Sequence, residues 1–276
     1  MNRISVAGAN PHLSTGGWRP GSLGALAAAA ALARCAPSRH VVLVHGAFMG
    51  GWAWDAVASQ LRQAGELVTV VNLPCHDPGT SSMEGATLDA YVDRVGQAVD
   101  AEPLPAVLVG HSMGGMVISQ YAERSPEKVQ RLIYLAAYLP SDGQNLVDLA
   151  FSDTGSQILG AAEIDQETGR VSLARDALQP ILCGDCTPEE AKVLRDRYHD
   201  EPLLPMATPV HLSAERFGAV PKAYVFTEGD QTITPELQHR MADAVTLAGA
   251  VTLDTSHTPQ LSAPGKLAAA LQHLLP

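Results

Sequence analysis

From residue 40 onward the chain repeats a short apolar strand followed by a helix, and this alternation limits its fold more than any other feature. The expected strands are rich in Val, Leu and Ile and lie at 40–46, 67–74, 105–110, 129–139, 222–229 and 250–256. The expected helices lie at 52–65, 86–99, 113–124, 235–245 and 264–275. Near-continuous apolar strands separated by helices are typical of a parallel sheet that is covered on both faces. We therefore expect an α/β fold with a mainly parallel six-stranded sheet.

The alternation is interrupted between the fourth and the fifth expected strand. Residues 140–213 hold helical patterns at 146–151 and 188–199, with polar sequence between them and three prolines near the end. This pattern indicates a mostly helical cap that is inserted into the core. The sequence then divides into a leader (1–39), a first part of the core (40–139), the cap (140–213) and a second part of the core (214–276).

The leader, residues 1–39, shows no strand pattern and contains an alanine-rich run at 23–33. With Arg3 and Arg19 upstream, this run resembles an export signal, and it is too short to span a bilayer. The alternative is an extension without structure. The protein is exported if residues 1–33 act as a signal peptide and cytoplasmic otherwise, and the sequence leaves both open.

Charge and cysteine spacing exclude several functions. A formal net charge of −11 argues against nucleic acid or an anionic membrane as a partner, because both favour clusters of Lys and Arg. The CGDC stretch at 183–186 could be a redox pair or half of a zinc site. It has no second CxxC and lies outside a strand-to-helix junction, which favours an incidental placement. We expect no metal and no cofactor.

The stretch GHSMGG at 110–115 follows the third expected strand and opens a helix. In that context G-x-S-x-G predicts a nucleophile elbow, in which the glycines permit a sharp turn and leave the Ser112 hydroxyl at the sheet edge. The helix that follows favours negative charge near its N-terminus. The alternative is a capping serine between permissive glycines.

A serine becomes a useful nucleophile when a base removes its proton, and this fold requires the chain order Ser, acid, His. Asp230 and His257 each follow one of the last two expected strands. The carboxyl ends of parallel strands meet at one edge of the sheet, where catalytic groups gather. Asp254 competes with Asp230 as the acid, but it lies within its expected strand. We therefore predict Ser112, Asp230 and His257 as the catalytic residues.

Acyl transfer also needs an oxyanion hole made of backbone N–H groups. One should come from Met113, which follows the serine, and the other from Ala47 in the glycine-rich loop after the first strand. His45 and His111 lie beside these positions, and we interpret both as structural.

The stretches VLVHGAFMGGWAW, VLVGHSMGGMVI, TEGDQTITPELQ and DTSHTPQLSAP together resemble the α/β-hydrolase superfamily. The branch they are most similar to holds plant methyl-ester esterases, the salicylic-acid-binding esterase, hydroxynitrile lyases and related bacterial esterases. The resemblance covers residues 40–276. It implies the α/β-hydrolase fold, a nucleophile at Ser112, an acid at Asp230, a base at His257 and oxyanion amides at Ala47 and Met113.

Two departures bear on the reaction. The resemblance implies a threonine at position 46 and a lysine at position 258 in a hydroxynitrile lyase, whereas this chain has Gly46 and Thr258. The sequence therefore favours a serine hydrolase that cleaves a small carboxylic ester through an acyl-enzyme. Carbon–carbon bond cleavage on the same triad and a non-catalytic ligand receptor are the alternatives. A homodimer is compatible with the sequence.

The apolar cap residues indicate the kind of ester. Leu146, Phe151, Ile158 and Met206 belong to a group of cap side chains with few charges near them. Such a group favours an apolar pocket and a hydrophobic ester. The other interpretation, that these side chains only pack the cap onto the core, is equally consistent with the sequence.

Overall fold

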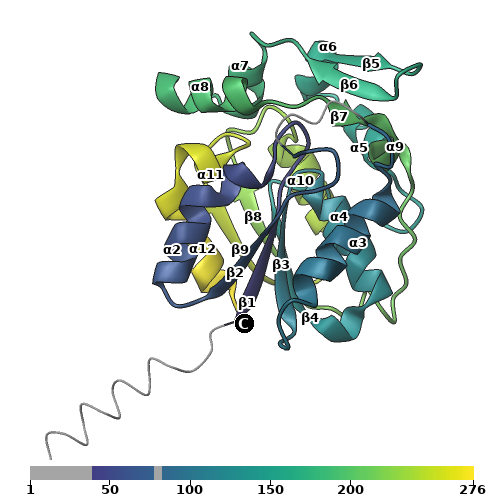
Figure 1. The fold of residues 1–276 in the computed structure, drawn as a ribbon, viewed down its shortest axis with the longest axis vertical. Helices are drawn as coiled ribbons and strands as arrows, with labels where there is room; N and C mark the ends of the chain where they lie inside the picture. Colours follow the sequence, from purple (N-terminus) through teal and green to yellow (C-terminus); the bar gives the residue numbers. More distant parts are fainter. Residues whose placement is uncertain (1–38, 78–82) are drawn as a thin grey trace, which may run out of the picture. The chain divides into compact units, whose positions relative to one another are not determined.

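The computed structural model describes residues 39–77 and 83–276, so nearly all of the expected leader lies outside the described residues. Its main feature is a six-stranded parallel sheet with the strand order β2-β1-β3-β4-β8-β9 (Figure 1). The strands are β1 (His40–Val44), β2 (Leu67–Val71), β3 (Ala106–His111), β4 (Val129–Leu135), β8 (Lys222–Thr227) and β9 (Leu247–Leu253). The expected α/β class and six-stranded sheet are confirmed.

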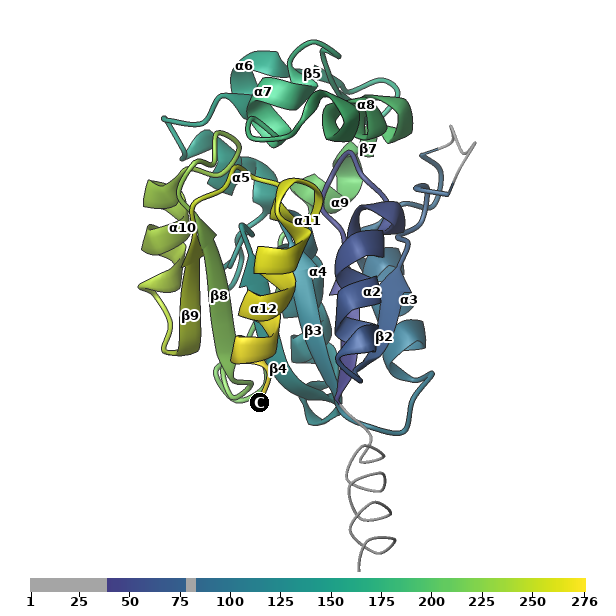
Figure 2. The ribbon, with the colours of Figure 1, turned by 90° about the vertical axis from the view of Figure 1, so that its left-hand side faces the viewer.

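Helices cover both faces of this sheet (Figure 2). One face packs against α2 (Asp55–Gln63) and α12 (Pro264–Leu274). The other packs against α3 (Leu88–Val99), α4 (Gly114–Arg124) and α10 (Pro235–Ala242). The reason is the two-residue period of a strand, which sends Val41 and Leu43 of β1 to the first face and Val42 and Val44 to the second. In the described parts of the chain, no helix has the length and apolar character needed to cross a membrane.

A set of short elements lies between β4 and β8 in the chain, in the region of the proposed cap, and over the carboxyl ends of the strands (Figure 2). Its elements are α5 (Leu146–Phe151), α6 (Ile158–Ala161), β5 (Ala162–Asp165), β6 (Arg170–Leu173), α7 (Leu178–Leu182), α8 (Pro188–Arg197), β7 (Glu201–Pro202) and α9 (Leu203–Ala207). Strands β5, β6 and β7 form a small antiparallel sheet that the sequence analysis does not predict. All three strands are short, and β5 and β6 are partly exposed, so none has the apolar run that marks the core strands.

Five of the six core strands end earlier than expected, and the end of β4 shapes the site. Strand β4 stops at Leu135 and not at residue 139, because Ala136 takes a left-handed backbone conformation with φ of 42° and turns the chain. The Tyr138 N–H then donates to the Ser112 carbonyl at 3.2 Å. Strand β9 likewise covers Leu247–Leu253, shifted from the expected 250–256. The β4 turn places Tyr138 beside the elbow serine.

Three of the connections between the core strands and helices contain a short helix. A 3-10 helix at Gly51–Trp54 leads into α2, a second at Pro126–Lys128 precedes β4, and α11 (Pro259–Ser262) follows β9. The last of these begins directly after the loop that carries His257, so it fixes where that loop ends.

Candidate active site

Ser112 lies in a tight turn between β3 and α4. Its backbone φ is 53°, which is uncommon for a residue with a side chain, and its N–H donates to the Leu135 carbonyl at 3.2 Å. The turn packs closely on the end of β1: a Cβ at Gly114 would lie 2.9 Å from the carbonyl oxygens of Val44 and His45. A glycine is therefore required at position 114, and the strand–turn–helix context expected for the elbow is present.

Asp230 and His257 meet in a buried pair. The His257 Nδ1 lies 2.8 Å from Asp230 Oδ2, and because a carboxylate only accepts, Nδ1 carries the proton. In the neutral form of the ring, Nε2 then keeps the lone pair. The other carboxylate oxygen accepts the N–H groups of Thr232 at 2.8 Å and Ile233 at 2.9 Å, and Gln238 donates to Oδ2 at 3.1 Å. These donors fix the orientation of the carboxylate.

Asp254, the competing acid of the sequence analysis, is exposed at the surface. The structure brings Asp230 and not Asp254 to His257. Asp254 directly follows the last residue of β9 and stays at the surface. His257 lies three residues further along the chain and is buried.

His111 supports the loop of His257. Its Nε2 donates to the His257 carbonyl at 2.9 Å, and its Nδ1 accepts from the Gln260 side chain at 3.1 Å. Burial lowers the pKa of His111 well below its ordinary value, and the neighbouring His257 lowers it further. A neutral ring that donates through Nε2 fits both contacts, which agrees with the structural role expected for this histidine.

The loop after β1 is held by His45 in a similar way. The Leu73 N–H donates to His45 Nε2 at 3.1 Å, so Nδ1 carries the proton and donates to the Gly46 carbonyl at 2.8 Å. Burial lowers the pKa of His45 well below its ordinary value, so the ring stays neutral. In a trans peptide the C=O and the next N–H point in opposite directions. His45 therefore fixes the direction of the Ala47 amide.

Ala47 and Met113 line the same small cavity as Ser112 and His257. Within residues 39–77 and 83–276, neither of these two amides donates a backbone hydrogen bond. Two amides at one cavity with a serine and a histidine could accept a developing oxyanion between them. Gly46 leaves room for this arrangement, because a Cβ there would lie 2.7 Å from the Ser112 Cβ.

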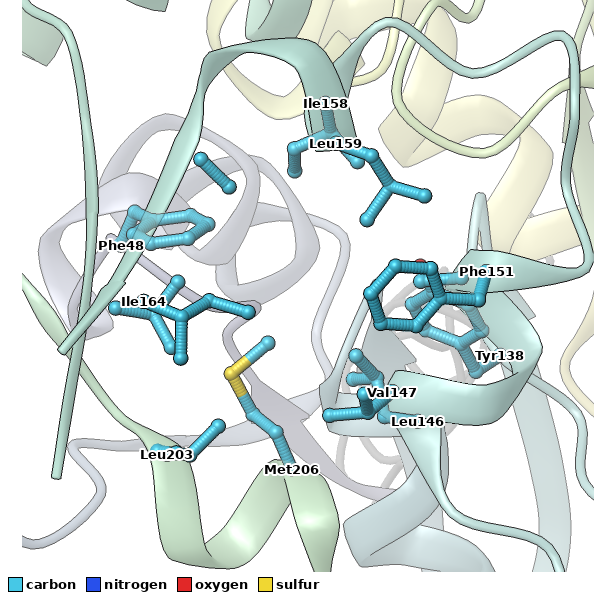
Figure 3. A pocket seen from close by; sticks show the side chains of 13 residues that line it. Phe48, Tyr138, Leu146, Val147, Phe151, Ile158, Leu159, Ile164, Leu203 and Met206 are labelled. Carbon is cyan, nitrogen blue, oxygen red and sulfur yellow. The ribbon is translucent and has the colours of Figure 1, made fainter. Parts of the chain in front are cut away.

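A second, apolar cavity adjoins this one. The two share Phe48, Tyr138, Leu146, Ile158 and Met206, so they are continuous in their lining. Figure 3 shows side chains from the core loops and from the cap around a common space, with the Tyr138 hydroxyl and the Met206 sulfur among otherwise hydrocarbon groups. The cap residues of the sequence analysis therefore line a cavity in addition to packing the cap.

The cap also contacts the loop that carries His257. Asp185 accepts the Ser256 N–H at 3.1 Å and the Ser262 hydroxyl at 3.0 Å. It lies in the CGDC turn, whose Cys183 and Cys186 form a disulfide. The sequence analysis favours an incidental placement for this cysteine pair, and the structure joins the two sulfurs in the turn that carries Asp185. The short CxxC spacing was the signal for it.

Sequence and structure comparisons agree with this architecture. The model of the "Alpha/beta hydrolase family" matches residues 41–270. Salicylic acid-binding protein 2 of Nicotiana tabacum is 26% identical over 84% of this chain and 95% of its own length. Methyl jasmonate esterase 1 of Vitis vinifera is 27% identical over 86% of this chain and 97% of its own.

A solved structure and two longer relatives complete the comparison. The crystal structure of polyneuridine aldehyde esterase has a TM-score of 0.78 and 24% identity, covering 86% of this chain and 98% of that one, which supports the fold. Two relatives from Arabidopsis thaliana that carry the name methylesterase are longer, and the matches span 69% and 56% of them.

Proposed function

The chain belongs to the alpha/beta hydrolase family, and on this premise we propose that it is a serine hydrolase that cleaves carboxylic esters through an acyl-enzyme. The Ser112 hydroxyl attacks the ester carbonyl while His257 Nε2 accepts its proton, and Asp230 holds the imidazole in the required tautomer. The amides of Ala47 and Met113 stabilise the oxyanion of the tetrahedral intermediate.

The remaining steps follow from proton balance. The protonated His257 gives its proton to the leaving alkoxide, so the alcohol departs and the acyl group stays on Ser112. Water then loses a proton to His257 and attacks the acyl-enzyme, which releases the carboxylic acid and restores the serine. This reaction needs no cofactor.

One observation carries the proposal more than any other. It is the 2.8 Å contact between His257 Nδ1 and Asp230 Oδ2, at a cavity that Ser112 and His257 line together. A buried histidine oriented by a carboxylate beside an elbow serine is the arrangement that activates a hydroxyl nucleophile. The names of the relatives, among them a methyl jasmonate esterase, favour an ester as the substrate.

The adjoining cavity suggests a small hydrophobic ester. Its lining includes Leu146, Ile158 and Met206, which also line the small cavity that holds Ser112. An acyl chain attached to Ser112 would leave water as it enters this space, which favours apolar chains. We therefore expect p-nitrophenyl butyrate to have a higher kcat/KM than p-nitrophenyl acetate.

Turnover of p-nitrophenyl butyrate tests the proposal directly. Ser112→Ala should lower kcat by a factor on the order of 10⁶, because triad members act as one unit. A fluorophosphonate should label the wild type with one equivalent at Ser112 and should leave the variant unlabelled. Release of one equivalent of p-nitrophenol without turnover would favour a ligand receptor, and full turnover by Ser112→Ala would contradict the assignment.

A further inference from the structure

Phe48 follows Ala47, the proposed oxyanion donor, and the cap binds both its N–H and its carbonyl group. The Phe48 N–H donates to Glu201 Oε2 at 2.9 Å, and the Phe48 carbonyl accepts the His199 N–H at 3.1 Å. Phe48 has a φ of 65°, in the left-handed region that disfavours residues with a side chain. Such a conformation persists only where the surroundings enforce it. The cap segment that carries Glu201 supplies both of these contacts.

Glu201 is a buried carboxylate with three donors. Its side chain is fully buried, and it also accepts from the His76 ring at 2.9 Å and the Tyr91 hydroxyl at 3.2 Å. The other ring nitrogen of His76 lies 2.9 Å from the Pro74 carbonyl. Both ring nitrogens of His76 thus face acceptors, so the doubly protonated imidazolium satisfies them best. An imidazolium balances the charge of Glu201.

The pKa of His76 agrees with this pairing. Burial opposes the charged ring, but the charge of Glu201 and the hydrogen bonds to Glu201 and to backbone carbonyls outweigh it and raise the pKa. The result is an ion pair inside the protein between a core loop and cap strand β7.

A buried ion pair is a costly way to attach a cap, since apolar side chains can seat it as well or better. An apolar side chain at position 201 would leave the Phe48 N–H without this acceptor. The Phe48 N–H belongs to the peptide that joins Ala47 to Phe48, so holding it also restrains Ala47. The Ala47 amide must be fixed in place before charge develops on the substrate oxygen. The carboxylate therefore holds the loop through the Phe48 N–H, which an apolar side chain cannot do.

We propose that Glu201 is a positioning residue that holds the loop after β1 in its working conformation, so that the Ala47 amide is correctly placed only while β7 is seated on the core. This inference rests on the proposed function, because it assigns a task within the same site. It makes the cap part of the machinery that prepares the oxyanion hole, in addition to a wall of the substrate cavity.

The test compares two cap carboxylates. Glu201→Ala removes the contact to Phe48, and Asp153→Ala is the matched control. Asp153 is also a nearly buried cap carboxylate, and it accepts the N–H and hydroxyl of Thr234 at 2.8 and 2.6 Å, away from the loop. With p-nitrophenyl butyrate, Glu201→Ala should lower kcat about 10- to 100-fold with KM within about threefold. Asp153→Ala should keep kcat within about threefold while losing a similar amount of thermal stability.

The conservative variant separates positioning from mere attachment. Glu201→Gln keeps an oxygen that can accept the Phe48 N–H, so it should recover kcat to within about fivefold of the wild type. If Glu201→Ala does not fold, Glu201→Asp replaces it, because its shorter side chain withdraws the carboxylate from Phe48. The proposal is overturned if the folded Ala or Asp variant retains kcat, if the loss lies in KM alone, or if Asp153→Ala loses as much kcat.

A second readout separates this inference from the ester assignment. The oxygen of a fluorophosphonate occupies the oxyanion hole when Ser112 is labelled, so the labelling rate should fall in Glu201→Ala by a factor similar to that in kcat. If the wild type does not turn over esters but its labelling is slowed by Glu201→Ala, the proposed function fails and the positioning role stands. An unchanged labelling rate in a folded variant overturns the positioning role.

Discussion

Asp230 is the residue whose surroundings are most specific to its proposed task. Five donors converge on its two oxygens: the N–H groups of Thr232 and Ile233, the Thr227 hydroxyl, the Gln238 amide and the His257 ring. Each of them comes from β8, from the turn after it, from α10 or from the loop after β9. A carboxylate with so many donors can orient an imidazole without turning toward another partner.

The substitution Asp230→Asn tests this assignment at the residue scale. The amide cannot keep His257 in the same tautomer, and we expect kcat to fall by a factor on the order of 10⁴ while the fold survives. The measurement is steady-state hydrolysis of p-nitrophenyl butyrate with circular dichroism as the check on folding.

Asp254→Asn is the control, because Asp254 is exposed and lies outside the cavity. Its kcat should stay within about threefold of the wild type, as is usual for surface substitutions away from a site. The reverse order of the two variants would show that Asp254 is the acid and would remove Asp230 from the triad.

Among the elements, two parts of the cap reach the two loops of the site. Strand β7 holds the loop after β1 through Glu201, and the CGDC turn between α7 and α8 holds the loop after β9 through Asp185. Glu201 and Asp185 do not line the two cavities beside Ser112, although Phe48, which Glu201 holds, lines both of them. The cap elements therefore combine two tasks, because one set of side chains forms the cavity and another set fixes the loops beneath it.

The buried pair of His76 and Glu201 predicts how stability depends on pH. The folded state raises the pKa of His76 above its ordinary value of about 6.5, so folding binds a proton in the range between the two values. The contribution of the pair is complete below the ordinary pKa and is lost as the pH rises through the raised one. The free energy of unfolding should therefore exceed that of His76→Gln by more at about pH 6 than at about pH 9.

Urea unfolding at both pH values measures this difference, with Tyr91→Phe as the control. Tyr91 donates to the same carboxylate, and burial raises the pKa of its phenol, so it is neutral at both pH values. The loss of stability in Tyr91→Phe should be the same at both. The neighbouring His45 and His199 have lowered pKa values, so their titration does not make the folded state more stable at low pH. The ion pair is contradicted if the difference in the free energy of unfolding between the wild type and His76→Gln is constant or grows with pH.

At the scale of the whole molecule, every proposed site residue comes from residues 39–276. Ala47 follows β1, Ser112 and Met113 follow β3, Asp230 follows β8 and His257 follows β9. Strands β1 and β3 are neighbours in the sheet, at the point where the chain changes direction between β2 on one side and β4 on the other. Sites of open parallel sheets lie at such a point.

A shortened chain that starts at Ser38 should therefore keep most of its turnover and its melting temperature. The reason is that the family match begins at residue 41 and the first strand of the described residues begins at His40. The measurement is kcat with p-nitrophenyl butyrate together with thermal unfolding of the shortened and the full chain. A large loss of either would show that the expected leader contributes to the folded core.

The sequence by itself determined the elements of the core and the chain order of the site. Apolar strand patterns, helical spacing and the GHSMGG turn are local signals, so the six strands, the flanking helices and the position of the elbow could be predicted. The positions of Asp230 and His257 after strands also followed from the pattern, and the structure brings both to one cavity with Ser112. Their catalytic roles remain a proposal.

Only the tertiary structure decided the order of the strands, the early end of β4 at Leu135, the hairpin of the cap and the contact between Glu201 and Phe48. The last of these joins residues that are 153 positions apart. A contact of this kind has no local pattern, because neither residue's neighbours in sequence show which distant group it will meet. Packing of the cap on the core selects it, and the buried charge of Glu201 can be satisfied only once that packing is complete.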